Sequence, residues 1–161
     1  MRFHRRSRDA AFRDFYPGQL GQKMLDLELA KTMEPATDGM PNDVLIVEDD
    51  PIIALDCEDT LLGFGVKTVR TAGSVAKALV MIDERPPDFA LLDVSLIREK
   101  SFAVAERLDS LKIPYAFVTG YGADATLPAA FTGKPRLPKP YSTDALHALL
   151  ARAYGRGASS A

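Results

Sequence analysis

The sequence contains a single cysteine, Cys57, and no tryptophan among its 161 residues. One cysteine excludes an intrachain disulfide, which fits a reducing compartment. No apolar run approaches the roughly 20 residues of a membrane-spanning helix, and the arginine-rich start lacks the apolar stretch of a secretory signal. The formal net charge of −2 gives no indication of nucleic-acid binding. We therefore expect a cytoplasmic protein that contacts neither a membrane nor a nucleic acid.

Four short apolar runs have the length and composition of buried strands, and each ends at a polar side chain. The run around Leu91 follows Pro86-Pro87 and is uninterrupted, as expected of a strand covered on both faces. The polar residues after the four runs are, in chain order, Glu48-Asp49-Asp50, Asp93, Thr119 and Lys139. If the strands are parallel, these side chains meet at one edge of the sheet, where α/β proteins bind their ligands.

Several carboxylates at one edge require a compensating cation. Oxygen ligands of this kind suit Mg²⁺, which takes one or two carboxylates and keeps several waters. Asp93 has the chemistry of a nucleophile that forms an aspartyl phosphate. Thr119 and Lys139 would then bind phosphoryl oxygens, one by a hydrogen bond and the other by its charge. Asp50 has a second interpretation as the N-cap of the following helix, with Pro51 at the first helical position.

The order of these residues resembles that of a response-regulator receiver domain of two-component signalling. The matching positions are Glu48-Asp49 after the first strand, Asp93 after the third, Thr119 after the fourth and Lys139-Pro140 after the fifth. The resemblance extends over residues 42–154. It implies a flavodoxin-like, doubly wound α/β fold, with a five-stranded parallel sheet of order 2-1-3-4-5 and helices on both faces.

The resemblance also implies a function. A sensor histidine kinase or a histidine phosphotransfer protein would transfer a phosphoryl group to Asp93. Mg²⁺ would be held by Glu48, Asp49, Asp93 and the backbone carbonyl of Ser95. Such a phosphorelay protein is a phosphoacceptor and not an enzyme, apart from self-phosphorylation by small donors and autodephosphorylation. Because no output domain is recognised after the last helix, we expect signalling through protein–protein interaction, by a monomer or a weak dimer.

Two further features refine the resemblance. The stretch Phe117-Val118-Thr119-Gly120-Tyr121 is similar to the Phe-Ala-Thr-Gly-x-Tyr signature of a subgroup of single-domain regulators in alphaproteobacteria. In the family, the positions of Ser95 and Tyr121 tune the lifetime of the phosphoryl group, and the Lys139-Pro140 bond is expected to be cis. Arg136 departs from the family pattern, which has an aromatic residue three positions before the lysine. Tyr121 or Arg136 itself would have to replace that aromatic side chain in the switch.

We divide the chain into an N-terminal extension (residues 1–41), a receiver domain (residues 42–155) and a flexible tail (residues 156–161). The extension is expected to be partly helical or disordered, with a helix over Gln19–Met33. Its arginine-rich residues 1–13 are either a mobile end or a basic arm that contacts a partner. The other predicted helices are Pro51–Leu62, Val75–Glu84 capped by Ser74, one around Ala103–Leu111, a short one over Asp124–Phe131, and one from Ser142 to Gly155.

The main alternative is a pseudo-receiver, which binds partners without being phosphorylated. The complete set of acids, hydroxyl and lysine argues against it, whereas Arg136 and the short fourth helix argue for it. A phosphatase of the haloacid-dehalogenase type needs Asp-x-Asp after the first strand, and Glu48-Asp49-Asp50 does not supply that pattern. A P-loop motif is absent from the sequence.

Overall fold

The computed structural model describes residues 39–120 and 127–158. Contacts within the chain divide it into two units, Met1–Ala36 and Thr37–Ala161. All described residues belong to the second unit. The predicted helix over Gln19–Met33, the arginine-rich residues 1–13 and the proposed tuning residue Tyr121 therefore lie outside the described residues. No helix in the described part of the chain has the length and apolar character needed to cross a membrane.

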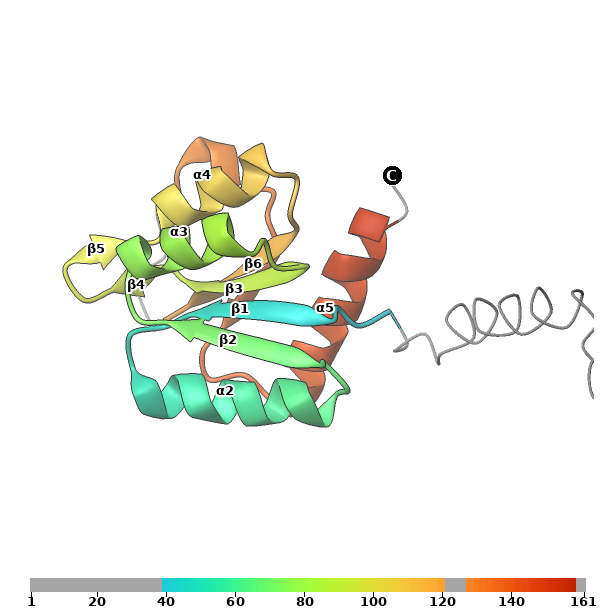
Figure 1. Ribbon diagram of the computed structural model, residues 1–161. Coiled ribbons are helices and arrows are strands. Elements are labelled where there is room, and N and C mark those ends of the chain that lie inside the picture. Colours follow the sequence, from blue (N-terminus) through green and yellow to red (C-terminus); the bar gives the residue numbers. More distant parts are fainter. Residues whose placement is uncertain (1–38, 121–126, 159–161) are drawn as a thin grey trace, which may run out of the picture. The chain divides into compact units, whose positions relative to one another are not determined.

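The centre of the fold is a five-stranded parallel sheet (Figure 1). Its strands are β1 (Asp43–Val47), β2 (Thr68–Ala72), β3 (Phe89–Asp93), β6 (Tyr115–Thr119) and β7 (Arg136–Pro138). They lie in the order β2-β1-β3-β6-β7, with every neighbouring pair parallel. This arrangement confirms the predicted order 2-1-3-4-5. Every residue of β3 and β6 is buried, which explains why their sequences are almost continuously apolar.

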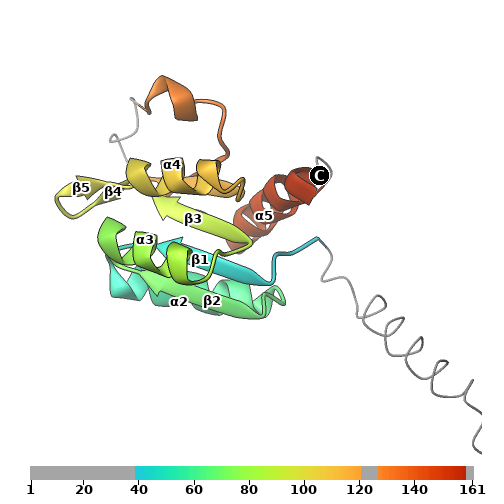
Figure 2. The same ribbon diagram turned by 45° about the horizontal axis from the view of Figure 1, so that its top comes forward.

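Helices cover both faces of the sheet, as Figures 1 and 2 show from two directions. The helices are α2 (Pro51–Gly63), α3 (Val75–Glu84), α4 (Phe102–Ser110), α5 (Thr143–Ala158) and the 3-10 turn η1 (Ala129–Phe131). One core cluster joins α3, α4 and η1 to the sheet, and a second joins α2 and α5 to the opposite face. The doubly wound α/β architecture is therefore confirmed.

Polar side chains cap the N-termini of three helices. Asp50 Oδ1 accepts hydrogen bonds from the N–H groups of Ile52 and Ile53 at 2.9 and 3.3 Å. Ser74 caps α3 and Ser142 caps α5 in the same way, at 3.2 and 3.1 Å. The interpretation of Asp50 as an N-cap is confirmed, and these caps satisfy N–H groups that have no partner inside the helix.

The structure differs from the sequence predictions at three places. α5 continues past Gly155 to Ala158, into the segment predicted as a flexible tail. A glycine inside a helix costs only about 1 kcal/mol relative to alanine, which the packed apolar stripe of α5 outweighs. The sequence predicts that the helix after Asp50 buries Ile53, but in α2 Ala54 is buried and Ile53 is 38% exposed. The sequence predicts a loop over Val94–Lys100 after Asp93, but this segment contains a small antiparallel hairpin, β4 (Ser95–Leu96) and β5 (Glu99–Lys100).

Candidate functional site

The polar residues that follow the strands gather at the carboxyl edge of the sheet. Glu48 and Asp49 follow β1, Asp93 ends β3, Thr119 ends β6 and Lys139 follows β7. Neighbouring parallel strands end at the same edge, so residues far apart in the sequence become neighbours in space. Glu48 and Asp93 are buried carboxylates, at 7% exposure each.

Lys139 bridges the two buried carboxylates. Its Nζ atom lies 2.9 Å from Glu48 Oε2 and 2.9 Å from Asp93 Oδ2. Both contacts are charge-assisted hydrogen bonds donated by the ammonium group. Burial alone would lower the pKa of Lys139, but its bonds to Glu48 and Asp93 outweigh burial and raise that pKa above its ordinary value. Lys139 is therefore charged at neutral pH and partly neutralises the acidic cluster.

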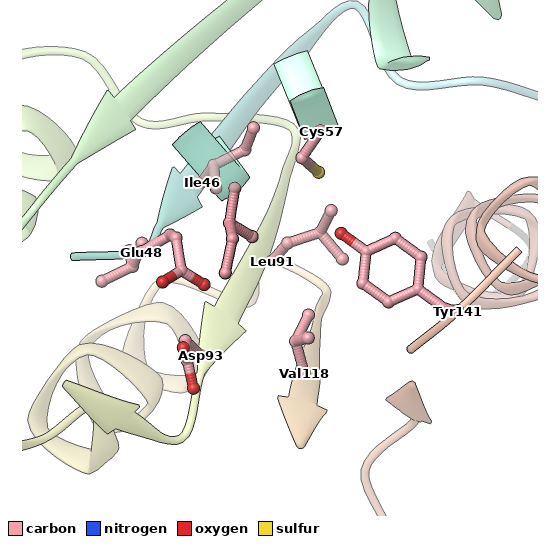
Figure 3. Close-up of a pocket in the computed structure, with 9 residues that line it drawn as sticks. Ile46, Glu48, Cys57, Leu91, Asp93, Val118 and Tyr141 are labelled. Atoms are coloured by element: carbon pink, nitrogen blue, oxygen red, sulfur yellow. The ribbon is translucent and has the colours of Figure 1, made fainter. Parts of the chain in front are cut away.

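Glu48 lies against a mainly apolar pocket. Figure 3 shows Glu48 and Asp93 beside a small pocket whose remaining wall includes Leu91, Val118 and Tyr141. The pKa of Glu48 is raised from 4.5 to about 7, chiefly by burial and also by the neighbouring Asp93, against the lowering effect of Lys139. Without a metal ion, Glu48 therefore gives up its proton at a higher pH than an ordinary glutamate does.

Three carboxylates lie close enough together to hold a metal ion. Glu48, Asp49 and Asp93 each offer an oxygen, and these oxygens lie within 4.8 Å of one another. An arrangement of hard oxygen donors fits Mg²⁺, which combines one or two carboxylates with waters. The predicted fourth ligand belongs to Ser95, whose backbone N–H donates to Asp93 Oδ1 at 3.1 Å. Ser95 therefore lies directly beside the acidic cluster.

Residues 44–151 match the response regulator receiver domain family. This chain belongs to that family. It is 40% identical to SdrG from Sphingomonas melonis Fr1, with a TM-score of 0.61, and the match covers 68% of this chain and 93% of SdrG. It is 27% identical to NtrX from Brucella abortus, with a TM-score of 0.66, covering 73% of this chain and 28% of that structure.

Curated relatives support the same family. The phyllosphere-induced regulator PhyR of Methylorubrum extorquens is 32% identical over 102 residues, or 62% of this chain and 38% of PhyR. The transcriptional regulatory protein PdtaR of Mycobacterium tuberculosis is 30% identical over 91 residues, or 54% of this chain and 44% of PdtaR. The chain thus spans less than half of the length of these relatives. The shared part is the receiver domain.

Three other features predicted for the receiver site concern Thr119, the Lys139-Pro140 bond and Arg136. Thr119 is buried, and its carbonyl oxygen accepts from the Lys139 N–H at 2.7 Å, which joins β6 to the lysine loop. The Lys139-Pro140 peptide bond is cis, as predicted. Arg136 begins β7 with an exposed side chain, outside the acidic cluster. The Thr119 hydroxyl has no hydrogen-bond partner within residues 39–120 and 127–158.

The Ser95–Lys100 hairpin was missed by sequence reasoning, although it contacts the site directly. The Ile97 N–H donates to Asp49 Oδ2 at 2.7 Å, and Lys100 Nζ donates to Ser95 Oγ at 2.6 Å. The turn between its strands consists of Ile97 and Arg98, and Arg98 has φ = +64°. Glycine or asparagine is the usual sequence signal for such a turn. Neither residue occurs here, so the hairpin leaves no recognisable pattern.

Proposed function

We propose that this receiver domain accepts a phosphoryl group on Asp93 from a sensor histidine kinase or a histidine phosphotransfer protein. The observation that carries the proposal is the contact of Lys139 with both Asp93 and Glu48 at 2.9 Å, inside a cluster of three carboxylates. Mg²⁺ would be held by Glu48, Asp49, Asp93 and the backbone carbonyl of Ser95. When bound, Mg²⁺ neutralises charge on the transferring phosphoryl oxygens.

The residues of the site have separate roles in the transfer. A carboxylate oxygen of Asp93 forms a bond to phosphorus while the bond from phosphorus to the donor's leaving atom breaks, and the leaving atom keeps the electron pair. The Ser95 N–H orients the Asp93 carboxylate through its bond to Oδ1. Lys139 offsets the negative charge on the transferred group, and the Thr119 hydroxyl donates a hydrogen bond to one of its oxygens. The protein acts as a phosphoacceptor rather than as an enzyme on a separate substrate.

Phosphorylation changes the charge at this edge of the sheet. A phosphoryl group carries about −1.5 to −2 charges at neutral pH, whereas the Asp93 carboxylate carries one. Thr119 ends β6, and its carbonyl oxygen accepts a hydrogen bond of 2.7 Å from the Lys139 N–H, so the two residues are joined directly. Movement of these two residues toward the phosphoryl group alters the surface near β6 and β7. A downstream protein partner recognises the altered surface.

The test is intact mass spectrometry after incubation with acetyl phosphate and MgCl₂. We expect one added phosphoryl group that requires Mg²⁺ and is absent from an Asp93→Asn variant. Asp50→Asn is the matched control, because Asp50 lies in the same acidic stretch but caps α2, and asparagine is an equally good cap. An unmodified wild-type protein in the presence of bound Mg²⁺ would refute phosphorylation and favour the pseudo-receiver interpretation.

A further inference from the structure

The Ser95–Lys100 hairpin lies beside the N-terminal end of α3 in both views of the fold (Figures 1 and 2). We propose that this hairpin holds Asp49 in the orientation required for Mg²⁺ binding, and that Glu99 is the positioning residue that fixes the hairpin. Glu99 touches neither the metal site nor the phosphoacceptor, and it acts through the Ile97 N–H. The inference rests on the proposed Mg²⁺-dependent function and assigns a role there to residues outside the predicted ligand set.

The contact with Asp49 is the first step of the argument. The Ile97 N–H donates to Asp49 Oδ2 at 2.7 Å, a short charge-assisted bond. Asp49 is only half-buried, so burial does not fix the direction of its carboxylate. A bond to one oxygen restricts rotation of the carboxylate and leaves the other oxygen free for a cation. Bonds of this kind to metal-ligating side chains commonly change metal affinity by about 10- to 100-fold.

Glu99 attaches the hairpin to a rigid element. Its Oε1 atom accepts a hydrogen bond of 2.9 Å from the N–H of Val75, the first residue of α3. The positive end of the helix dipole favours a carboxylate at this position. Ser74 caps a different N–H of the same turn, that of Lys77, so the two side chains do not compete. α3 is itself fixed on the sheet through buried Ala78 and Ile82.

The hairpin needs such an attachment because its own structure is weak. Each strand has only two residues, and an isolated two-stranded hairpin is marginal in water. Its turn places Arg98 in the left-handed region, which is unfavourable for a residue with a side chain. Inside the hairpin, Lys100 Nζ donates to Ser95 Oγ across the paired strands. Buried Leu96 packs in the same core cluster as Ala78 and Ile82 of α3 and holds the first strand of the hairpin. The second strand is exposed, and the Glu99 bond to the Val75 N–H attaches it to α3 beside the turn, so that loss of this bond frees the Ile97 N–H from Asp49.

The experiment compares Mg²⁺ affinity of the full chain and its variants by isothermal titration calorimetry. We expect Glu99→Ala to weaken Mg²⁺ binding by about tenfold, at the lower end of the range for such supporting contacts. Glu106→Ala is the matched control, since Glu106 is exposed on α4 and its side chain makes no hydrogen bond or ion pair among the described residues. Glu99→Gln keeps an acceptor oxygen and should recover part of the lost affinity.

A second readout separates positioning from general destabilisation. In ¹H–¹⁵N spectra of the metal-free protein, the Ile97 amide of the wild type should show the downfield proton shift of a charge-assisted hydrogen bond, and Glu99→Ala should lose it while the core amides stay unchanged. Equal Mg²⁺ affinity in Glu99→Ala and the wild type would overturn the positioning role while leaving the proposed function intact. If the wild type itself binds no Mg²⁺, both the proposed function and this inference are contradicted.

Discussion

The titration of Glu48 predicts how the stability of the metal-free protein depends on pH. The pKa of Glu48 is raised from 4.5 to about 7, because the side chain is buried beside Asp93. A carboxyl group whose folded-state pKa is raised binds a proton more tightly in the folded than in the unfolded state. The folded state therefore loses stability as the pH rises from about 4.5 to about 7, and the full penalty remains above that range.

The size of the penalty follows from the two pKa values. Each tenfold difference in proton affinity between the folded and unfolded states is worth about 1.4 kcal/mol. A pKa of about 7 against 4.5 then destabilises the metal-free protein by about 3 kcal/mol at pH 8. A glutamine at position 48 keeps the shape and the acceptor oxygen but does not ionise. Glu48→Gln should therefore match the wild type near pH 4.5 and be about 3 kcal/mol more stable at pH 8.

Urea unfolding followed by far-UV circular dichroism measures this difference, since the chain has no tryptophan to report by fluorescence. Both proteins are unfolded in EDTA at several pH values between 4.5 and 8, and again with saturating MgCl₂. Mg²⁺ should remove the wild type's disadvantage, because a bound cation stabilises the ionised carboxylate. Parallel pH profiles for wild type and Glu48→Gln in EDTA would refute the reasoning.

Two further predictions concern stability away from the site. Lys112 follows α4 with φ = +57°, a backbone conformation that favours glycine. Lys112→Gly should therefore raise the free energy of unfolding, measured with urea, by up to about 1 kcal/mol. A free energy of unfolding below that of the wild type would contradict this. Arg70 is 14% exposed and bonds both oxygens of Asp43 at 3.0 Å. Arg70→Met should cost about 2 kcal/mol, because within residues 39–120 and 127–158 Asp43 then keeps Arg85 as its one ion-pair partner. Arg107→Met, which breaks the exposed ion pair with Asp83, should cost less than about 1 kcal/mol of stability. Equal losses of stability in Arg70→Met and Arg107→Met would contradict the view that burial makes the Arg70 pair matter more.

The fold was predictable because the strongest sequence signals, the apolar runs that end in polar residues, are the strands of the sheet. The run that ends in Asp93 is buried along its whole length, and the polar residue at its end lies at the sheet edge where the other strands end. Caps such as Asp50 followed by Pro51 mark helix starts through local chemistry alone. The end of α5 was not predictable from Gly155, because packing of the helix on the sheet decides whether a local preference prevails.

The site was only partly predictable, for a different reason. Residue type and strand position indicated that Glu48, Asp93 and Lys139 would meet, and the 2.9 Å contacts agree with this. The contact between Asp49 and the Ile97 N–H involves a backbone group, whose direction no residue type encodes. The turn that presents this N–H has Arg98 where glycine would have been the signal. Contacts made by the backbone through an atypical turn therefore escape sequence reasoning.

In the proposed function, the charges at the sheet edge would make Mg²⁺ binding and phosphorylation depend on each other. The ionised forms of Glu48, Asp49 and Asp93 carry three negative charges, and Lys139 compensates one of them. A divalent cation would neutralise the remaining two, which removes the reason for Glu48 to keep its proton. A phosphoryl group on Asp93 would replace one charge by about two and make the neutral site negative again. Because a buried excess charge is unfavourable, the added charge would draw Lys139 and the Thr119 hydroxyl toward the phosphoryl group.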